Sequence, residues 1–241
     1  MSTRFVLAVL VAASGAAFAA ADEIPLLDLE SVVGSLVLAP PPALPAVSSP
    51  SLRLVWLDPA GVATGMDAMA REEATALFRS MGASATWRRG RAGETARPGE
   101  VRVILLDRAA EREPGTPVLG ATPGHFEVAP LVWVHVPNVR AALGLPRQGS
   151  AFAMDLAVSR ALGIALGRVV AHEVVHAFVP WVPHGTGLMS ASLSHRQLTA
   201  ASMAFDPAVA AAVRAALRGE APPTQPGSRT LAAAAVAKET E

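Results

Sequence analysis

Three of the six histidines of this 241-residue chain lie close together, at positions 172, 176 and 184. His172 and His176 are four residues apart, so on a helix both imidazoles leave the same face about one turn apart. Two imidazole nitrogens placed in this way can bind one metal ion. Glu173 lies on the flank of that face, where its carboxylate can accept a proton from a water at the metal. The pattern H-E-x-x-H therefore predicts a zinc site with Glu173 as the general base.

A catalytic zinc ion needs a third protein ligand and an open fourth position. His184 follows the expected end of the helix after VPWVP, and we favour it because a turn there brings it back to the helix face. His195, near the start of a later helix, remains the main rival. Carboxylates are poorer candidates, since Asp206 precedes a proline in an N-cap context and Glu220 is followed by APP.

Two other interpretations of these residues stay open. The first is a metal-free structural domain, although burying two imidazoles and a carboxylate without partners would cost on the order of several kcal/mol. The second is a non-catalytic zinc-binding module that recognises peptides or cell-envelope partners. Metal content separates the first from a zinc site, and replacing Glu173 separates the second from an enzyme.

The segment HEVVHAFVPWVPHGTGLM resembles the metzincin zinc metallopeptidases, especially the matrixin branch, and small exported bacterial proteins with a longer spacer to the third histidine. The matrixin pattern is H-E-x-x-H-x-x-G-x-x-H, followed by a turn around a methionine. Here the spacer to the third histidine is two residues longer, and Val179 and Pro180 stand where the family has its glycine and the next residue.

The resemblance implies a fold and a role for each matching residue. His172, His176 and His184 would be the zinc ligands, Glu173 the catalytic base, and Met189 the methionine of a turn beneath the metal. The implied fold is a zincin-like catalytic domain. The implied partner is a peptide or protein substrate.

In that family an antiparallel edge strand lines the cleft and pairs with an extended peptide. The segment PVLGATPG, residues 117–124, is the candidate here, with an ordinary loop as the equal alternative. Such peptidases often stabilise the oxyanion with a tyrosine, but this chain contains none. A backbone N–H, Arg168, His195 or His125 would have to replace it. Arg168, one turn before His172, is better explained as a structural ion-pair partner.

The order of the other elements predicts an α+β (mixed α/β) fold, with a twisted mixed sheet packed on a long active-site helix and short C-terminal helices after it. Apolar runs bounded by turn residues predict the strands, and helical spacing predicts the helices. We expect strands at 52–57, 84–89, 100–107 and 131–137, the last ended by Pro137, and helices at 66–81, 151–179, 194–204 and 207–218.

The N-terminal residues have the layout of a secretory signal peptide: Arg4, a short apolar run and small residues around Ala19 and Ala21. We therefore expect a signal peptide at 1–21, a Pro-rich linker at 22–50, the metallopeptidase-like domain at 51–219 and a disordered tail at 220–241. The protein is expected to be exported, to the periplasm or outside the cell.

Composition excludes several classes of function. The chain carries 20 basic and 20 acidic residues and no cysteine, which rules out a thiol nucleophile and a Cys-ligated zinc. No basic stripe favours nucleic acid, and we expect no membrane span in the mature chain. The sequence is thus interpreted as an exported zinc metallopeptidase, a hydrolase of peptide bonds.

Overall fold

The computed structural model describes residues 49–123, 130–149 and 155–220. In this part of the chain, one sheet contains five strands in the order β2-β1-β3-β7-β6. Four of them run parallel: β1 (Ser51–Leu57), β2 (Ser84–Arg89), β3 (Glu100–Leu106) and β7 (Leu131–His135). The short edge strand β6 (Gly120–Ala121) is antiparallel to β7. The hairpin of β4 (Glu111–Glu113) and β5 (Thr116–Pro117) forms a separate two-stranded sheet.

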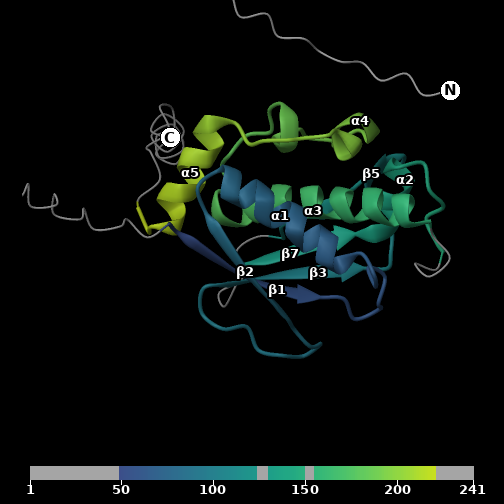
Figure 1. Cartoon of the computed structure of the whole chain (residues 1–241), viewed down its shortest axis with the longest axis horizontal. Coiled ribbons are helices and arrows are strands. Elements are labelled where there is room, and N and C mark those ends of the chain that lie inside the picture. Colours follow the sequence, from purple (N-terminus) through teal and green to yellow (C-terminus); the bar gives the residue numbers. More distant parts are fainter. Residues whose placement is uncertain (1–48, 124–129, 150–154, 221–241) are drawn as a thin grey trace, which may run out of the picture. The chain divides into compact units, whose positions relative to one another are not determined.

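The helices include two long ones that pack on one face of the sheet, α1 (Asp67–Ser80) and α3 (Leu156–Phe178). Figure 1 shows α1 in blue and α3 in green lying side by side above the strands. The shorter elements are α2 (Val136–Ala142), the 3₁₀ turn η3 (Gly187–Met189), α4 (His195–Thr199) and α5 (Pro207–Leu217). The mixed α/β architecture expected from the sequence is confirmed.

The core lies between the sheet and these two helices, because alternate residues of each strand point to the same side. On β1 the inward residues are Leu52, Leu54 and Trp56, each at most 3 % exposed. Neighbouring strands in register continue that layer with Val101, Val103, Leu105, Val132 and Val134. This layer supports α3, the helix that carries the histidine pair.

Two glycines explain how α3 packs so closely against α1. A Cβ atom at Gly167 would lie 2.5 Å from the carbonyl oxygen of Ala70, and one at Gly163 would lie 3.0 Å from Cβ of Met69. Glycine lowers helix propensity, yet here it removes the side chain that would separate the two backbones. The position of the long helix therefore depends on residues that local propensity alone disfavours.

The structure corrects two of the expected boundaries. Pro137 does not end a strand at 131–137, because β7 stops at His135 and Pro137 lies in the first turn of α2. Proline suits that position, since its fixed φ is helical and the first turn needs no N–H donor. The expected helix at 194–204 is also too long, because α4 ends at Thr199. A capping residue begins each of the helices α4 and α5. Ser194 and Gln197 form a capping box on α4, and Asp206 accepts a hydrogen bond from Ala208 N on α5.

The helix α3 is long and apolar enough to span a membrane by length and composition. However, 72 % of its most apolar stretch is buried within the domain, as in the core helix of a globular protein. Asp155 caps its N-terminus by accepting from Ala157 N at 3.1 Å. The expected first residues of this helix, 151–154, lie outside the described residues, as do the signal peptide, all but the end of the linker and the tail from 221.

Candidate metal centre

The last turns of α3 place His172 and His176 on one face, with ring centroids 4.8 Å apart. The helix ends at Phe178, and Val182 N donates to Val179 O at 3.0 Å, which turns the chain. His184 then returns to the pair: its Nε2 lies 3.2 Å from Nε2 of His176, and its ring stacks 5.4 Å from that of His172. The three ligand atoms all lie within 4.8 Å of one another. The structure therefore brings His184 to the helix pair.

The hydrogen bond of His172 determines which nitrogen is available to a metal. Its Nδ1 lies 2.7 Å from the carbonyl oxygen of Leu188, which can only accept, so Nδ1 carries the proton. Nε2 is then left with a lone pair, which makes it the nitrogen of His172 available to a metal in the cluster. A metal-binding histidine is commonly held in this way by a carbonyl on its other nitrogen.

The segment from Gly185 to Met189 holds that carbonyl in place. Gly185 N donates to Met189 O at 2.8 Å, and Gln197 Nε2 donates to Gly187 O at 3.0 Å. Gly187 has φ 62°, in the left-handed region that other residues avoid. Met189 is only 2 % exposed and forms part of this turn. Its predicted position directly beneath a metal stays a prediction.

Glu173, a residue of α3, has its side chain buried against the edge strand β6. Its Oε1 lies 3.9 Å from Nε2 of His172. Thr122 Oγ1 lies 3.1 Å from Oε2 and 2.9 Å from the backbone oxygen of Glu173. Within the expected edge strand at 117–124, the structure forms the antiparallel pair Gly120–Ala121 against β7, and residue 124 lies outside the described part. The edge strand is thus confirmed for these two residues, and it lies against the carboxylate.

Burial shifts the pKa of each of these groups toward its neutral form. Desolvation raises the pKa of Glu173 to about 7, partly offset by the hydrogen bond from Thr122 and the positive charge of Arg112. Desolvation and the two neighbouring imidazoles lower the pKa of His176 to about 4. Burial likewise lowers the pKa of His172. Neutral imidazoles are the metal-binding form, and a carboxyl with pKa near 7 can accept and release a proton at neutral pH.

Two other candidates from the sequence, Arg168 and His195, do not belong to the cluster. Arg168 is 2 % exposed and is a structural partner, as expected: Nε donates to Glu73 at 2.8 Å, and Nη1 and Nη2 donate to the carbonyls of Gln197 and Ala200 at 2.7 Å each. His195 is exposed at the start of α4 and does not join the cluster. His125 lies outside the described residues.

Sequence reasoning missed three groups at this site: the Thr122 hydroxyl, the Leu188 carbonyl and the Arg112 side chain. Thr122 could have been predicted, because it belongs to the segment 117–124 that is expected to line the cleft. The carbonyl of Leu188 carries no sequence signal, because every residue has one. Arg112 acts on Glu173 from the hairpin strand β4, whose three residues are all exposed and show no apolar alternation.

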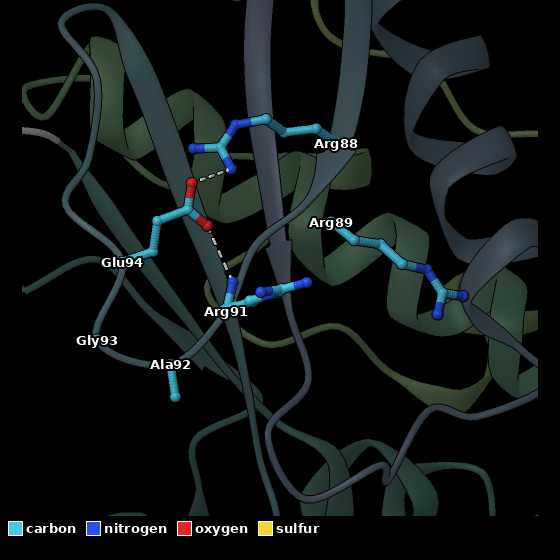
Figure 2. Close-up of a pocket in the computed structure, with 6 residues that line it drawn as sticks. All are labelled: Arg88, Arg89, Arg91, Ala92, Gly93 and Glu94. Carbon is cyan, nitrogen blue, oxygen red and sulfur yellow. Dashed lines mark hydrogen bonds and ion pairs between the residues drawn. The ribbon is translucent and has the colours of Figure 1, made fainter.

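A surface hollow formed by β2 and the loop after it contains none of these residues. It is lined by Arg88, Arg89, Arg91, Ala92, Gly93 and Glu94 (Figure 2). Arg88 donates to both carboxylate oxygens of Glu100 at 2.8 and 2.7 Å and to Glu94 at 2.7 Å. Arg89 points away from Arg88 in Figure 2 and pairs with Asp67. These ion pairs tie the β2–β3 loop to the strands, so we assign the hollow a structural role.

Similarity to known proteins does not help to identify the chain. No protein-family model matches it, and searches of curated proteins and of solved structures found no significant match. Any assignment of function therefore rests on the convergence of His172, His176 and His184 beside Glu173.

Proposed function

We propose that this protein is an exported zinc metallopeptidase in which His172, His176 and His184 hold the metal and Glu173 is the general base. One observation carries the proposal: three imidazoles from a helix and the loop after it converge beside a buried carboxylate. The site fits zinc in donor type, since three imidazoles with an open fourth position are a catalytic zinc set. The 3.2 Å between Nε2 of His176 and His184 is close to the spacing of about 3.4 Å for two nitrogens on one tetrahedral zinc.

In the metal-free protein, that short contact is a hydrogen bond between His176 and His184. One of the two neutral imidazoles donates its Nε2 proton to the other. Zinc binding requires both Nε2 atoms to be unprotonated, so the proton of the donor must move to Nδ1 or leave. His172 needs no such change, because its bond to Leu188 already leaves Nε2 free.

Zinc at this site would supply a Lewis acid that polarises the scissile carbonyl and lowers the pKa of the attacking water. Glu173 accepts the proton of that water on Oε1, the oxygen that faces His172, and passes it to the nitrogen of the leaving amine. Its pKa of about 7 in the zinc-free protein suits both transfers. The side of β6 that does not pair with β7 has no strand partner in the described chain, so an extended peptide can add there.

A zincin-like fold and a metzincin-like turn are part of the same proposal. The antiparallel edge strand beside the glutamate and the buried turn containing Met189 support it. Export rests on the N-terminal sequence alone.

The test pairs metal analysis with peptide cleavage, on wild type and Glu173→Gln. We expect about one zinc ion per chain in both proteins and a loss of cleavage of about 100-fold or more in the variant, measured on a fluorescence-quenched peptide library. His195→Ala is the matched control and should match wild type in both assays. Zinc without cleavage in wild type would favour a recognition module, and absence of bound zinc would favour a metal-free domain.

A further inference from the structure

We propose that Thr122 is a positioning residue, which holds one oxygen of Glu173 so that the other faces the three histidines. The inference rests on the proposed function and adds to it a residue from a different element. Thr122 directly follows β6, whereas Glu173 and two of the histidines lie on α3.

The two oxygens of the Glu173 carboxylate have different neighbours. Oε2 lies 3.1 Å from Thr122 Oγ1, and Oε1 lies 3.9 Å from Nε2 of His172. A carboxylate without such a tether could turn about its last torsion and carry the oxygen nearest His172 away from the histidines. The hydroxyl therefore fixes the plane of the carboxylate: one oxygen is held by Thr122, and the other is left for the water to be deprotonated.

The backbone around Gly120 keeps the strand close enough for this contact. A Cβ atom at Gly120 would lie 2.6 Å from Cγ and 2.9 Å from Oε1 of Glu173, and 2.9 Å from Cγ1 of Val169. Contacts that short do not occur, so any larger residue would push the strand or the carboxylate away. Gly120 and Thr122 thus act on the same side chain, one by close approach and the other by a hydrogen bond.

The Thr122 hydroxyl has one hydrogen and two acceptors within reach, Oε2 and the backbone oxygen of Glu173 at 2.9 Å. An ionised carboxylate is the stronger acceptor, because charge-assisted hydrogen bonds are about twice as strong as neutral ones. The hydroxyl therefore holds Oε2 when Glu173 is ready to act as a base. When Glu173 is neutral, the same hydrogen can go to the backbone oxygen of Glu173 instead.

The test compares Thr122→Val, which keeps the shape and removes the donor, with Thr122→Ser, which keeps the donor. Thr116→Val is the matched control, since Thr116 is exposed and its side chain makes no hydrogen bond in the described structure. For a peptide that wild type cleaves, we expect Thr122→Val to lower kcat about tenfold with KM within about twofold. Thr122→Ser should stay within about threefold of wild type, and the control should be unchanged.

Crystal structures of the zinc-loaded proteins supply a readout that does not need activity. Wild type and Thr122→Ser should keep one oxygen of the Glu173 carboxylate on the histidine side, near the 3.9 Å separation from His172 Nε2, and Thr122→Val should show the carboxylate plane turned or in two positions. An unmoved carboxylate in Thr122→Val, or an unchanged kcat, would overturn the inference. So would loss of zinc or of folding in Thr122→Val, because that would make Thr122 a structural residue. If wild type cleaves no peptide, the proposed function fails, and the crystal structures still decide the role of Thr122.

Discussion

Arg168 and His172 lie one turn apart on α3, and both are buried, but their surroundings differ. Every nitrogen at the end of the Arg168 side chain donates to a protein acceptor: Glu73, Gln197 O or Ala200 O. In the histidine cluster, Nε2 of His172 makes no hydrogen bond within the described chain, and the nitrogens of His176 and His184 meet each other. A buried polar group that the protein satisfies completely is structural, whereas imidazoles that converge on one another and leave a nitrogen without a partner indicate a place for a ligand.

The two clusters are connected through α4. Arg168 holds the carbonyl of Gln197, the side chain of Gln197 holds the carbonyl of Gly187, and the next residue, Leu188, orients His172. The satisfied cluster thus fixes the loop that the other cluster needs. Removing Arg168 should therefore lower stability, whereas removing the carboxyl of Glu173 from the zinc-free site should raise it at neutral pH.

Zinc should produce the largest change in stability. A ligand that binds only the folded state at 1,000 times its dissociation constant stabilises that state by about 4 kcal/mol. We therefore expect the melting temperature to fall when zinc is removed with a chelator and to recover when zinc is restored. Calorimetry on the full chain measures this change. A melting temperature that ignores the chelator would contradict a filled histidine site.

Removing Arg168 should cost nearly as much. Arg168→Met leaves the carboxylate of Glu73 and two carbonyls without their donor, which should lower the free energy of unfolding by about 3 kcal/mol. Urea unfolding of the zinc-free protein measures it. Arg160→Met, at an exposed position of the same helix, is the control and should stay within about 0.5 kcal/mol of wild type. A loss below about 1 kcal/mol at Arg168 would remove the distinction between the clusters.

The glutamate of the site should instead destabilise the zinc-free protein at neutral pH. The pKa of Glu173 in the folded state is raised from 4.5 to about 7. Because the folded state then binds more protons than the unfolded state between these values, the stability contributed by this group falls as pH rises from 4.5 to 7.

Glu173→Gln removes that dependence. The zinc-free variant should gain about 3 kcal/mol over wild type on going from pH 4.5 to pH 8. Urea unfolding at the two pH values, with chelator present, measures the difference. The His176 shift, from 6.5 to about 4, acts in the opposite direction, but it is common to both proteins and cancels between them. An equal difference at both pH values would show that the carboxyl is not buried as described.

The ion pairs of the Arg88 hollow should give the smallest effect, with the opposite dependence on pH. Arg88 holds the pKa of Glu100 at about 2, below its usual 4.5. The stability that this pair contributes is present above pH 4.5 and is lost as pH falls from 4.5 to 2. Glu100→Gln should therefore lower the melting temperature by a few degrees at pH 7 and make little difference at pH 2. A constant difference across this range would contradict the pairing.

The part of the site on one continuous segment could be predicted from the sequence. His172, Glu173 and His176 share a helix, and helical spacing alone places them. His184 was predicted because Pro180 must end the helix and only a short loop remains before it. Arg168 was also interpreted correctly as structural, although Gln197 and Ala200 were not foreseen as its partners.

The rest depends on contacts between distant segments, which periodicity does not encode. Thr122 reaches Glu173 across 51 residues of sequence, and only because a two-residue strand adds to the edge of the sheet. Proline breaks strands, so the sequence predicts that Pro137 ends one, whereas in the structure it lies in the first turn of α2. In both cases the position of the residue in the folded protein, and not its type, determines what it does.

Zinc titration of the purified protein and its single-histidine variants tests the central claim most directly. Competition with a chromophoric chelator should give one tight site per chain in wild type, weakened by about 100-fold or more in His172→Ala, in His176→Ala and in His184→Ala, and unchanged in His195→Ala. Equal affinity in the four variants, or no binding by wild type, would contradict the assignment of these three imidazoles to one metal ion.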